Sequence, residues 1–168
     1  KVLEQHDLEG LCGLVTSPDK SIGEKMVSDE RIALISATGS VPMGREVGQT
    51  AAKRFAKSIL ELGGNNAIIV MEDADLDMVI RGTLFGAVGT AGQRCTSTRR
   101  LLCHASVVDE VTSRLLKAYE QVQIGNPLDD ATLMGPLVTE TAIADMKAAL
   151  EQALEEGCEI LCGGLEGI

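Results

Sequence analysis

Apolar residues along this chain fall into two patterns, short continuous runs and helical spacings. Continuous runs predict strands covered on both faces, as parallel strands between helices are. They occupy residues 11–15, 32–35, 67–71, 101–104 and 159–162. Between the runs, apolar residues recur every three or four positions and predict helices over 22–27, 47–59, 76–88, 106–122 and 139–157. The alternation predicts the α/β fold class, with mainly parallel sheets and covering helices.

Polar and glycine residues mark several of the expected helix ends. Asp75, Ser106 and Thr139 each precede an apolar-periodic segment, where a side-chain oxygen can accept a hydrogen bond from the first helical turn. Gly157 predicts the end of the last helix, because glycine readily adopts the left-handed conformation that follows many helices. The small residues from Ala37 to Gly44 predict a loop between a strand and a helix.

Composition narrows the class of partner. The 168 residues are 45% hydrophobic and 24% charged, which is typical of a globular domain, but only 2% are aromatic, so we expect an aliphatic core. A net charge of −10 and the scarcity of aromatic residues argue against nucleic acid as a partner. No apolar segment approaches the 18 or so residues of a membrane span, and no signal peptide opens the chain, so we expect no membrane partner.

The five cysteines form an odd, scattered set, which predicts free thiols and a cytoplasmic location rather than a disulfide framework. Cys158 and Cys162 are four residues apart but have no histidine nearby, so we expect no metal site there or elsewhere. Cys12, Cys103 and Cys162 lie in apolar runs, where a thiol is usually an inert small hydrophobe.

Cys95 has a different setting. It follows the glycine-rich segment Gly89–Gly92, and polar or cationic residues surround it, among them Arg94, Arg99 and Arg100. Nearby positive charge lowers the pKa of a thiol and favours the reactive thiolate. We therefore expect Cys95 to be an exposed nucleophile, with an inert thiol as the ordinary alternative.

A candidate base, Glu61, stands 34 positions before Cys95. Leu60 and Leu62 flank it, and Gly63–Gly64 allows a sharp turn beside it. Partial burial raises the pKa of a carboxyl group and would let Glu61 accept a proton near neutral pH. The alternative is a solvated surface glutamate.

A third candidate is the loop from Thr38 to Gly44. It follows a strand and precedes a helix, so its backbone N–H groups favour an anion such as a phosphate. Its spacing differs from the common Gly-x-Gly-x-x-Gly dinucleotide fingerprint. An ordinary strand-to-helix turn is the alternative.

Taken together, three motifs resemble the NAD(P)-dependent aldehyde dehydrogenase superfamily: Glu61–Asn66, Gly92–Cys95 at its spacing, and the upstream Thr38–Ser40. Asn65–Asn66 and Gly89–Thr96 are most similar to the α-aminoadipic semialdehyde dehydrogenase (antiquitin) branch. The resemblance covers residues 11–164. Ala37 and Val41 depart from the common superfamily pattern, and neither removes a catalytic atom.

The resemblance implies that Cys95 attacks an aldehyde, that hydride passes to NAD, with NADP not excluded, and that Glu61 activates the water that releases a carboxylic acid. The backbone N–H of Cys95 would supply half of an oxyanion hole. The implied cofactor-binding residues are Thr38, Gly39, Ser40, Gly44, Leu62 and Gly63. The implied substrate-binding residues are Arg94 and Thr96, with Arg94 contacting the carboxylate of α-aminoadipic semialdehyde from lysine breakdown.

The resemblance also implies a domain organisation. Residues 1–62 would end a Rossmann-like NAD-binding domain, and residues 63–168 would begin the catalytic domain of a longer homo-oligomer, a dimer or tetramer. Because the chain begins at Lys1 without Met and ends just beyond a glycine pair, we expect an internal segment that is inactive alone. Three alternatives remain. They are an aldehyde dehydrogenase of another substrate class, a non-catalytic remnant that binds or assembles with a partner, and a thiol enzyme such as an acyl transferase or thiol hydrolase that needs no NAD.

Overall fold

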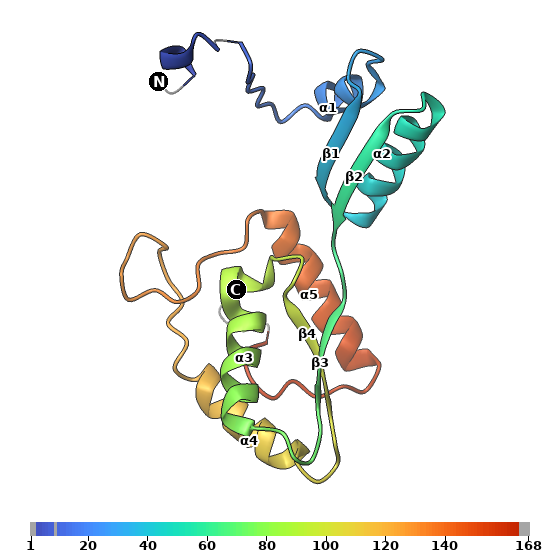
Figure 1. Ribbon diagram of the computed structural model, residues 1–168. Coiled ribbons are helices and arrows are strands. Elements are labelled where there is room, and N and C mark those ends of the chain that lie inside the picture. Colours follow the sequence, from blue (N-terminus) through green and yellow to red (C-terminus); the bar gives the residue numbers. More distant parts are fainter. Residues whose placement is uncertain (1–2, 9, 165–168) are drawn as a thin grey trace. The chain divides into compact units, whose positions relative to one another are not determined.

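The structure is a computed structural model that describes residues 3–8 and 10–164. The chain divides into two compact units, Lys1–Leu62 and Gly63–Ile168. Each unit contains a pair of parallel strands whose connection includes a helix (Figure 1). The predicted fold class, α/β with parallel sheets, is confirmed.

In the first unit, strand β1 (Leu34–Gly39) pairs in parallel with β2 (Lys57–Leu62). Two helices accompany the strands, α1 (Lys20–Ser28) and α2 (Val41–Lys53), and a 3₁₀ turn, η1 (Glu4–His6), lies near the start. Ile35 of β1 is buried together with Val47 and Ala51 of α2. This aliphatic contact between helix and sheet is the core of the unit, and it stabilises the unit by removing apolar area from water.

Helix α2 ends earlier than its apolar spacing predicts. The prediction of a helix over 47–59 is wrong after Lys53, because the chain turns at Phe55 (φ 58°) and continues as β2. The Phe55 N–H donates to the Ala52 carbonyl (3.1 Å) and the Ala56 N–H to the Ala51 carbonyl (2.9 Å). This is the Schellman pattern of helix termination, with phenylalanine at the left-handed position where glycine is usual.

The first apolar run is not a strand. Leu11, Leu14 and Val15 are 67%, 88% and 63% exposed, and the segment pairs with no strand in the described parts of the chain. The predicted buried strand over 11–15 is therefore wrong. A continuous apolar run shows that a segment could be buried, but a strand also needs a partner for its backbone. The predicted strand at 32–35 is confirmed, although it begins at Leu34 and extends to Gly39.

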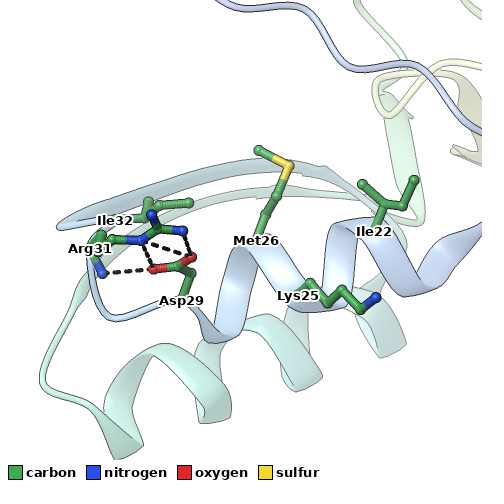
Figure 2. A pocket seen from close by; sticks show the side chains of 6 residues that line it. All are labelled: Ile22, Lys25, Met26, Asp29, Arg31 and Ile32. Carbon is green, nitrogen blue, oxygen red and sulfur yellow. Dashed lines mark hydrogen bonds and ion pairs between the residues drawn. The ribbon is translucent and has the colours of Figure 1, made fainter.

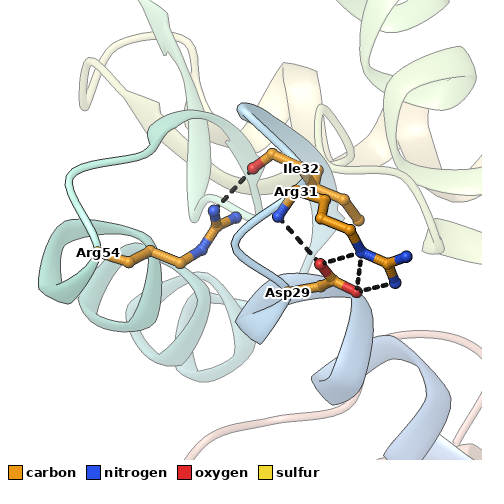
Figure 3. A network of polar contacts seen from close by, with 4 residues as sticks. All are labelled: Asp29, Arg31, Ile32 and Arg54. Atoms are coloured by element: carbon orange, nitrogen blue, oxygen red, sulfur yellow. Dashed lines mark hydrogen bonds and ion pairs between the residues drawn. The ribbon is translucent and has the colours of Figure 1, made fainter.

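Two arginines organise the turn between α1 and β1 (Figure 3). Arg54, just after α2, donates from Nε to the Val27 carbonyl (3.0 Å) and from Nη1 to the Ile32 carbonyl (2.7 Å). Arg54 thereby provides hydrogen-bond donors for backbone carbonyl groups at the end of α1 and before β1. Arg31 pairs with Asp29 at the surface, through Nε to Oδ1 (2.9 Å) and through its backbone N–H (3.0 Å).

The side-chain hydrogen bonds from Arg31 hold the pKa of Asp29 well below its usual range, and the Arg31 backbone N–H adds to the effect. A lowered pKa in the folded state means that this contact stabilises the fold above the unfolded-state pKa and is lost as the pH falls. We expect Arg31→Gln to raise the Asp29 pKa part of the way back, because the backbone bond remains. An NMR titration of the side-chain carboxyl measures this, with Arg45→Gln as control. An equal Asp29 pKa in both variants would contradict the assignment.

In the second unit, strand β3 (Asn66–Val70) pairs in parallel with β4 (Thr98–Cys103), with an irregularity between Asn66 and Ala67. The remaining elements are α3 (Leu76–Val88), η2 (Gly89–Gly92), α4 (Val108–Tyr119) and α5 (Glu140–Glu155). Val70 of β3 and Val111 of α4 are almost fully buried, and α3 packs against α4. The predicted strands at 67–71 and 101–104 are thus confirmed.

Three of the four predicted helix ends are confirmed in this unit. The Asp75 carboxylate accepts from the Met78 N–H (3.1 Å), and the Thr139 hydroxyl accepts from the Ala142 N–H (3.1 Å). Gly157, after α5, has the expected left-handed conformation (φ 85°). The prediction for Ser106 is wrong, because its hydroxyl bonds to the His104 ring (2.8 Å), and Val107 caps α4 without a side-chain bond.

The final predicted strand, at 159–162, is also wrong, because these residues join no sheet in the described chain. The reason is the same as for residues 11–15, since no strand among the described residues forms hydrogen bonds with their backbone groups. Val122 lies beyond the end of α4, which stops at Tyr119. Among the described residues, no helix is both long and apolar enough to cross a membrane.

Candidate active site

The first unit places Glu61 beside the predicted cofactor loop. Thr38 lies opposite Glu61 and Gly39 lies opposite Leu62 at the carboxyl ends of β1 and β2. Neighbouring strands are about 4.8 Å apart, so these residues share one edge of the sheet. In open parallel α/β sheets, ligands bind at the carboxyl ends of the strands. Residues that are 23 positions apart in the sequence are thus adjacent where that rule places a ligand.

The predicted loop is shorter than expected, since β1 continues through Gly39 and α2 begins at Val41. Only Ser40 separates them, and its hydroxyl caps α2 by accepting from the Met43 N–H (3.3 Å). The Gly44 N–H donates to the Ser40 carbonyl (2.9 Å), and Pro42 has no N–H. Within the first turn, Val41 therefore keeps the free backbone donor that an anion would use.

Gly44 allows α2 to lie directly against the end of β2. A Cβ atom at Gly44 would lie 2.6 Å from Leu62 Cδ1, closer than side chains tolerate. Gly44 is buried and Leu62 is half-buried. These two predicted cofactor residues therefore have a packing function, which fixes the end of β2 next to Glu61. Thr38, Gly39 and Ser40 remain exposed, as does Gly63 at the start of the second unit.

Glu61 itself is exposed, whereas Leu60 and Leu62 on either side are half-buried. The alternation follows from the strand, because successive side chains point to opposite faces. The expected partial burial of the carboxylate is therefore not provided by its own unit. The structure does provide a fixed backbone position for it on a paired strand.

A shallow hollow of about 400 Å³ lies along α1 and the turn before β1. Figure 2 shows the six residues that line it, Ile22, Lys25, Met26, Asp29, Arg31 and Ile32. It is at the amino end of β1, whereas Thr38 and Glu61 are at the carboxyl ends of their strands. We assign it no role in catalysis for that reason.

In the second unit, Cys95 occupies the tip of a tight turn between η2 and β4. The Ser97 N–H donates to the Arg94 carbonyl (3.1 Å), and the Ser97 hydroxyl accepts from the Arg94 N–H (3.1 Å). Ser97 is only 2% exposed, whereas Cys95 and Thr96 are exposed. The turn is thus anchored at its base and presents the thiol to solvent. No hydrogen bond among the described residues uses the Cys95 N–H.

Exposure of Cys95 agrees with its sequence setting, but exposure alone does not distinguish it. Cys12, Cys158 and Cys162 are also exposed, and Cys103 is half-buried in β4. The expectation that Cys12 and Cys162 lie inside buried strands is wrong, because neither segment forms a strand. What distinguishes Cys95 is the set of hydrogen bonds that fixes its turn.

Asn66, the first residue of β3, contributes to that set. Its side-chain amide donates to the Cys95 carbonyl (2.7 Å) and to the Ser97 carbonyl (3.1 Å). Sequence reasoning missed this residue. The sharp turn expected at Gly63–Gly64 is also wrong, because residues 63–65 form no turn and neither glycine has a positive φ.

The segment before Cys95 is strained. Thr90 (φ 56°), Ala91 (φ 50°) and Gly92 (φ 70°) are successive left-handed residues. That conformation costs a residue other than glycine roughly 1–2 kcal/mol. Gln93 compensates, because its amide donates to the carbonyls of Thr90 (3.1 Å) and Pro136 (3.3 Å) and accepts from the Val138 N–H (2.8 Å).

Arg94 is tied to helix α3. Its Nη2 donates to the Phe85 carbonyl (2.7 Å), and its guanidinium lies over the Phe85 ring, 4.6 Å from the centroid. Gly89 leaves room for it, since a Cβ there would lie 3.0 Å from Arg94 Cζ. Cation–π contact and hydrogen bond together hold the guanidinium. Neither Nε nor Nη1 has a hydrogen bond among the described residues, and because Nε is buried, Nη1 is the nitrogen left for a ligand.

The chain matches the family model described as the aldehyde dehydrogenase family over residues 3–167. It is 50% identical to α-aminoadipic semialdehyde dehydrogenase of Bos taurus over 164 residues, covering 98% of this chain and 30% of the relative. An NADP-dependent enzyme of E. coli has a similar structure, with a TM-score of 0.86 and 37% identity over 89% of this chain and 31% of the other.

A betaine aldehyde dehydrogenase of Staphylococcus aureus, solved in complex with NAD+, gives a TM-score of 0.82 at 30% identity, covering 86% of this chain and 30% of that one. The chain spans about a third of the length of the curated relatives it matches. The match to the family model extends over nearly all of its residues and includes both Glu61 and Cys95. The chain therefore belongs to the aldehyde dehydrogenase family.

Proposed function

We propose that the protein containing this chain oxidises an aldehyde to a carboxylic acid with NAD, and that Cys95 is its nucleophile. The observation that carries the proposal is the Cys95 turn, anchored on buried Ser97 and presenting an exposed thiol beside an unused backbone N–H. Its relatives support the chemistry, since they are named as aldehyde dehydrogenases.

In the proposed reaction, the Cys95 sulfur bonds to the aldehyde carbon and the carbonyl oxygen becomes an oxyanion. We propose that the Cys95 N–H donates to that oxygen, and such a donor acts most strongly in the transition state. NAD, when bound, would supply the acceptor for the hydride that leaves this carbon, which then remains bonded to Cys95 as a thioester. Glu61 then removes a proton from the water that attacks the Cys95 thioester, the C–S bond breaks, and the acid leaves.

The first unit fits part of the cofactor. Thr38 and Ser40 are exposed residues with hydroxyl groups, and they flank Gly39 at the carboxyl end of β1. Val41 has a free backbone N–H. Gly44 and Leu62 would hold this edge in place, and Gly63 follows it. We accordingly propose that residues 1–62 end the NAD-binding domain and that residues 63–168 begin the catalytic domain. We propose NAD as the cofactor, with NADP as the alternative, since the similar structures include an NAD+ complex and an NADP-dependent enzyme.

We further propose α-aminoadipic semialdehyde as the substrate. Its own carboxylate suits Arg94, whose Nη1 is available, and Thr96 is exposed beside Cys95. Two relatives that are 50% identical to this chain have that substrate in their names. The alternative is an aldehyde of another class. It has less support, because betaine aldehyde dehydrogenase is only 30% identical to this chain, whereas α-aminoadipic semialdehyde dehydrogenase is 50% identical. Participation in lysine breakdown, a cytoplasmic location and a homo-oligomeric state remain predictions.

The test compares α-aminoadipic semialdehyde with hexanal, an uncharged aldehyde with the same number of carbons, in the full-length protein with NAD. We expect kcat/KM to favour the semialdehyde by about 100-fold or more, because a site built to bind a charged group discriminates strongly against its absence. Arg94→Gln should remove most of that preference, and Arg99→Gln should not. NADH absorbance measures the rate.

Two outcomes would contradict the proposal. Equal kcat/KM for both aldehydes would exclude the substrate assignment, and acyl transfer without any NADH formation would favour a thiol enzyme instead. A full-length protein that forms neither product would favour the non-catalytic alternative. The isolated 168-residue chain should form no NADH in the same assay, because apolar side chains such as Ile59, Ile69 and Leu102 remain at least half exposed in it.

A further inference from the structure

The Asn66 amide replaces strand pairing at the point where β3 and β4 separate. Asn66 lies opposite Thr98, but the next pair is Ala67 with Arg100, so the ladder is irregular at this position. The amide instead reaches the carbonyl groups of Cys95 and Ser97 (2.7 and 3.1 Å). Gly64 makes room, since a Cβ there would lie 3.0 Å from Asn66 Oδ1 and 3.8 Å from the Cys95 carbonyl oxygen.

Both peptide groups that flank the Cys95 side chain are fixed as a result. The preceding carbonyl, of Arg94, accepts from the Ser97 N–H (3.1 Å), and the following carbonyl, of Cys95, accepts from Asn66 (2.7 Å). With the peptide planes on both sides held, the Cys95 Cα–Cβ direction and its N–H direction are held as well. No hydrogen bond among the described residues uses the Cys95 N–H, which remains open to a ligand.

We propose that Asn66 is a positioning residue for the reaction of Cys95. It acts through the Cys95 carbonyl. By holding the turn, it keeps the Cys95 N–H free and directed toward the position of an oxyanion. The inference rests on the proposed function of Cys95. A misplacement of about 1 Å at a reacting group can cost about 100-fold in rate, so two hydrogen bonds to this turn are sufficient to matter.

The test uses Asn66→Asp and Asn66→Ser in the full-length protein. Aspartate has the same shape but replaces the donor with an acceptor, which the two carbonyl oxygens repel, whereas serine retains one donor. Asn65→Asp is the matched control, because the Asn65 side chain makes no hydrogen bond among the described residues and only its carbonyl is used, by Arg100 (2.6 Å). Three quantities are measured: kcat for aldehyde oxidation, alkylation of Cys95 by iodoacetamide, and amide hydrogen exchange over residues 89–98.

We expect kcat to fall about 100-fold in Asn66→Asp and about 10-fold in Asn66→Ser, with Asn65→Asp within twofold of the unaltered protein. Alkylation of Cys95 should stay within about threefold, because it forms no oxyanion and does not need the aimed N–H. Hydrogen exchange over 89–98 should accelerate in the Asn66 variants alone. A merely structural role would lower alkylation and kcat together and accelerate exchange across the whole second unit.

The two proposals fail in different ways. If the unaltered protein oxidises no aldehyde, the proposed function fails, and the exchange comparison between Asn66→Asp and Asn65→Asp still tests the fixed turn. If the unaltered protein is active and both aspartate variants keep its kcat, Asn66 has no positioning role. Unchanged exchange over 89–98 in Asn66→Asp would also overturn the inference.

Discussion

Replacing Cys95 with alanine is expected to lower kcat for aldehyde oxidation by about 10⁴-fold or more, because no other group can form the covalent intermediate. The turn should survive the change. Its hydrogen bonds are made by the backbone of residues 94, 95 and 97, by the Ser97 hydroxyl and by the Asn66 amide, and none involves the thiol. The melting temperature should therefore stay within a few degrees while activity is lost.

The matched controls are Cys158→Ala and Cys103→Ala. Cys158 is an exposed thiol like Cys95, and Cys103 is half-buried in β4. Both variants should retain activity within about twofold, Cys103→Ala with some loss of stability because it removes packed atoms. Mass spectrometry after iodoacetamide treatment gives an independent measure. Activity retained in Cys95→Ala, or alkylation of Cys95 no faster than that of Cys103, would exclude it as the nucleophile.

Replacing Glu61 with glutamine should slow turnover by about 10²–10⁴-fold, the usual contribution of a general base. The loss should fall on the second half of the reaction, in which water attacks the Cys95 thioester. Rapid mixing of Glu61→Gln with substrate and NAD should therefore give one equivalent of NADH per Cys95 and then almost none. Mass spectrometry of the stalled protein should find the acyl group on Cys95.

Glutamine keeps the shape of Glu61, and the position of residue 61 is set by backbone pairing with β1, so the change should leave the fold intact. Glu46→Gln is the control, since Glu46 is an exposed carboxylate on α2 of the same unit. It should turn over normally. Normal steady-state turnover in Glu61→Gln, or loss of the first equivalent of NADH as well, would contradict the assignment of Glu61 to thioester hydrolysis.

For the candidate site, sequence reasoning identified the proposed reactive residues more readily than the residues that hold them in position. Cys95 was identifiable because glycine and cationic residues surround it in the chain. Asn66 and Phe85 were not, because an asparagine or a phenylalanine has no distinctive setting until the fold brings it to a particular carbonyl or guanidinium. Arg94 changed most. It was expected as a substrate contact, and the structure shows that Phe85 already binds one of its nitrogens and one face of its guanidinium.

For the fold, the sequence by itself determined the features that depend on neighbouring residues. Asp75 and Thr139 cap α3 and α5, and Gly157 ends α5, as predicted, because capping and left-handed turns are interactions within a few residues. The alternation of strands and helices was readable for the same reason. The buried face of each helix appears in the sequence as apolar residues spaced three or four positions apart.

The tertiary structure alone decided which apolar segments become strands and where the site is assembled. Phe55 ends α2 without glycine, β2 forms beside β1, and residues 11–15 pair with no strand of the described chain. Strand pairing joins backbone groups that are distant in sequence, so an apolar run cannot show whether it has a partner. The same pairing puts Glu61 next to Thr38, and the start of β3 puts the Asn66 amide on the carbonyl of Cys95. The sequence therefore determined which groups are candidates for reaction, and non-local hydrogen bonds determined how they are held.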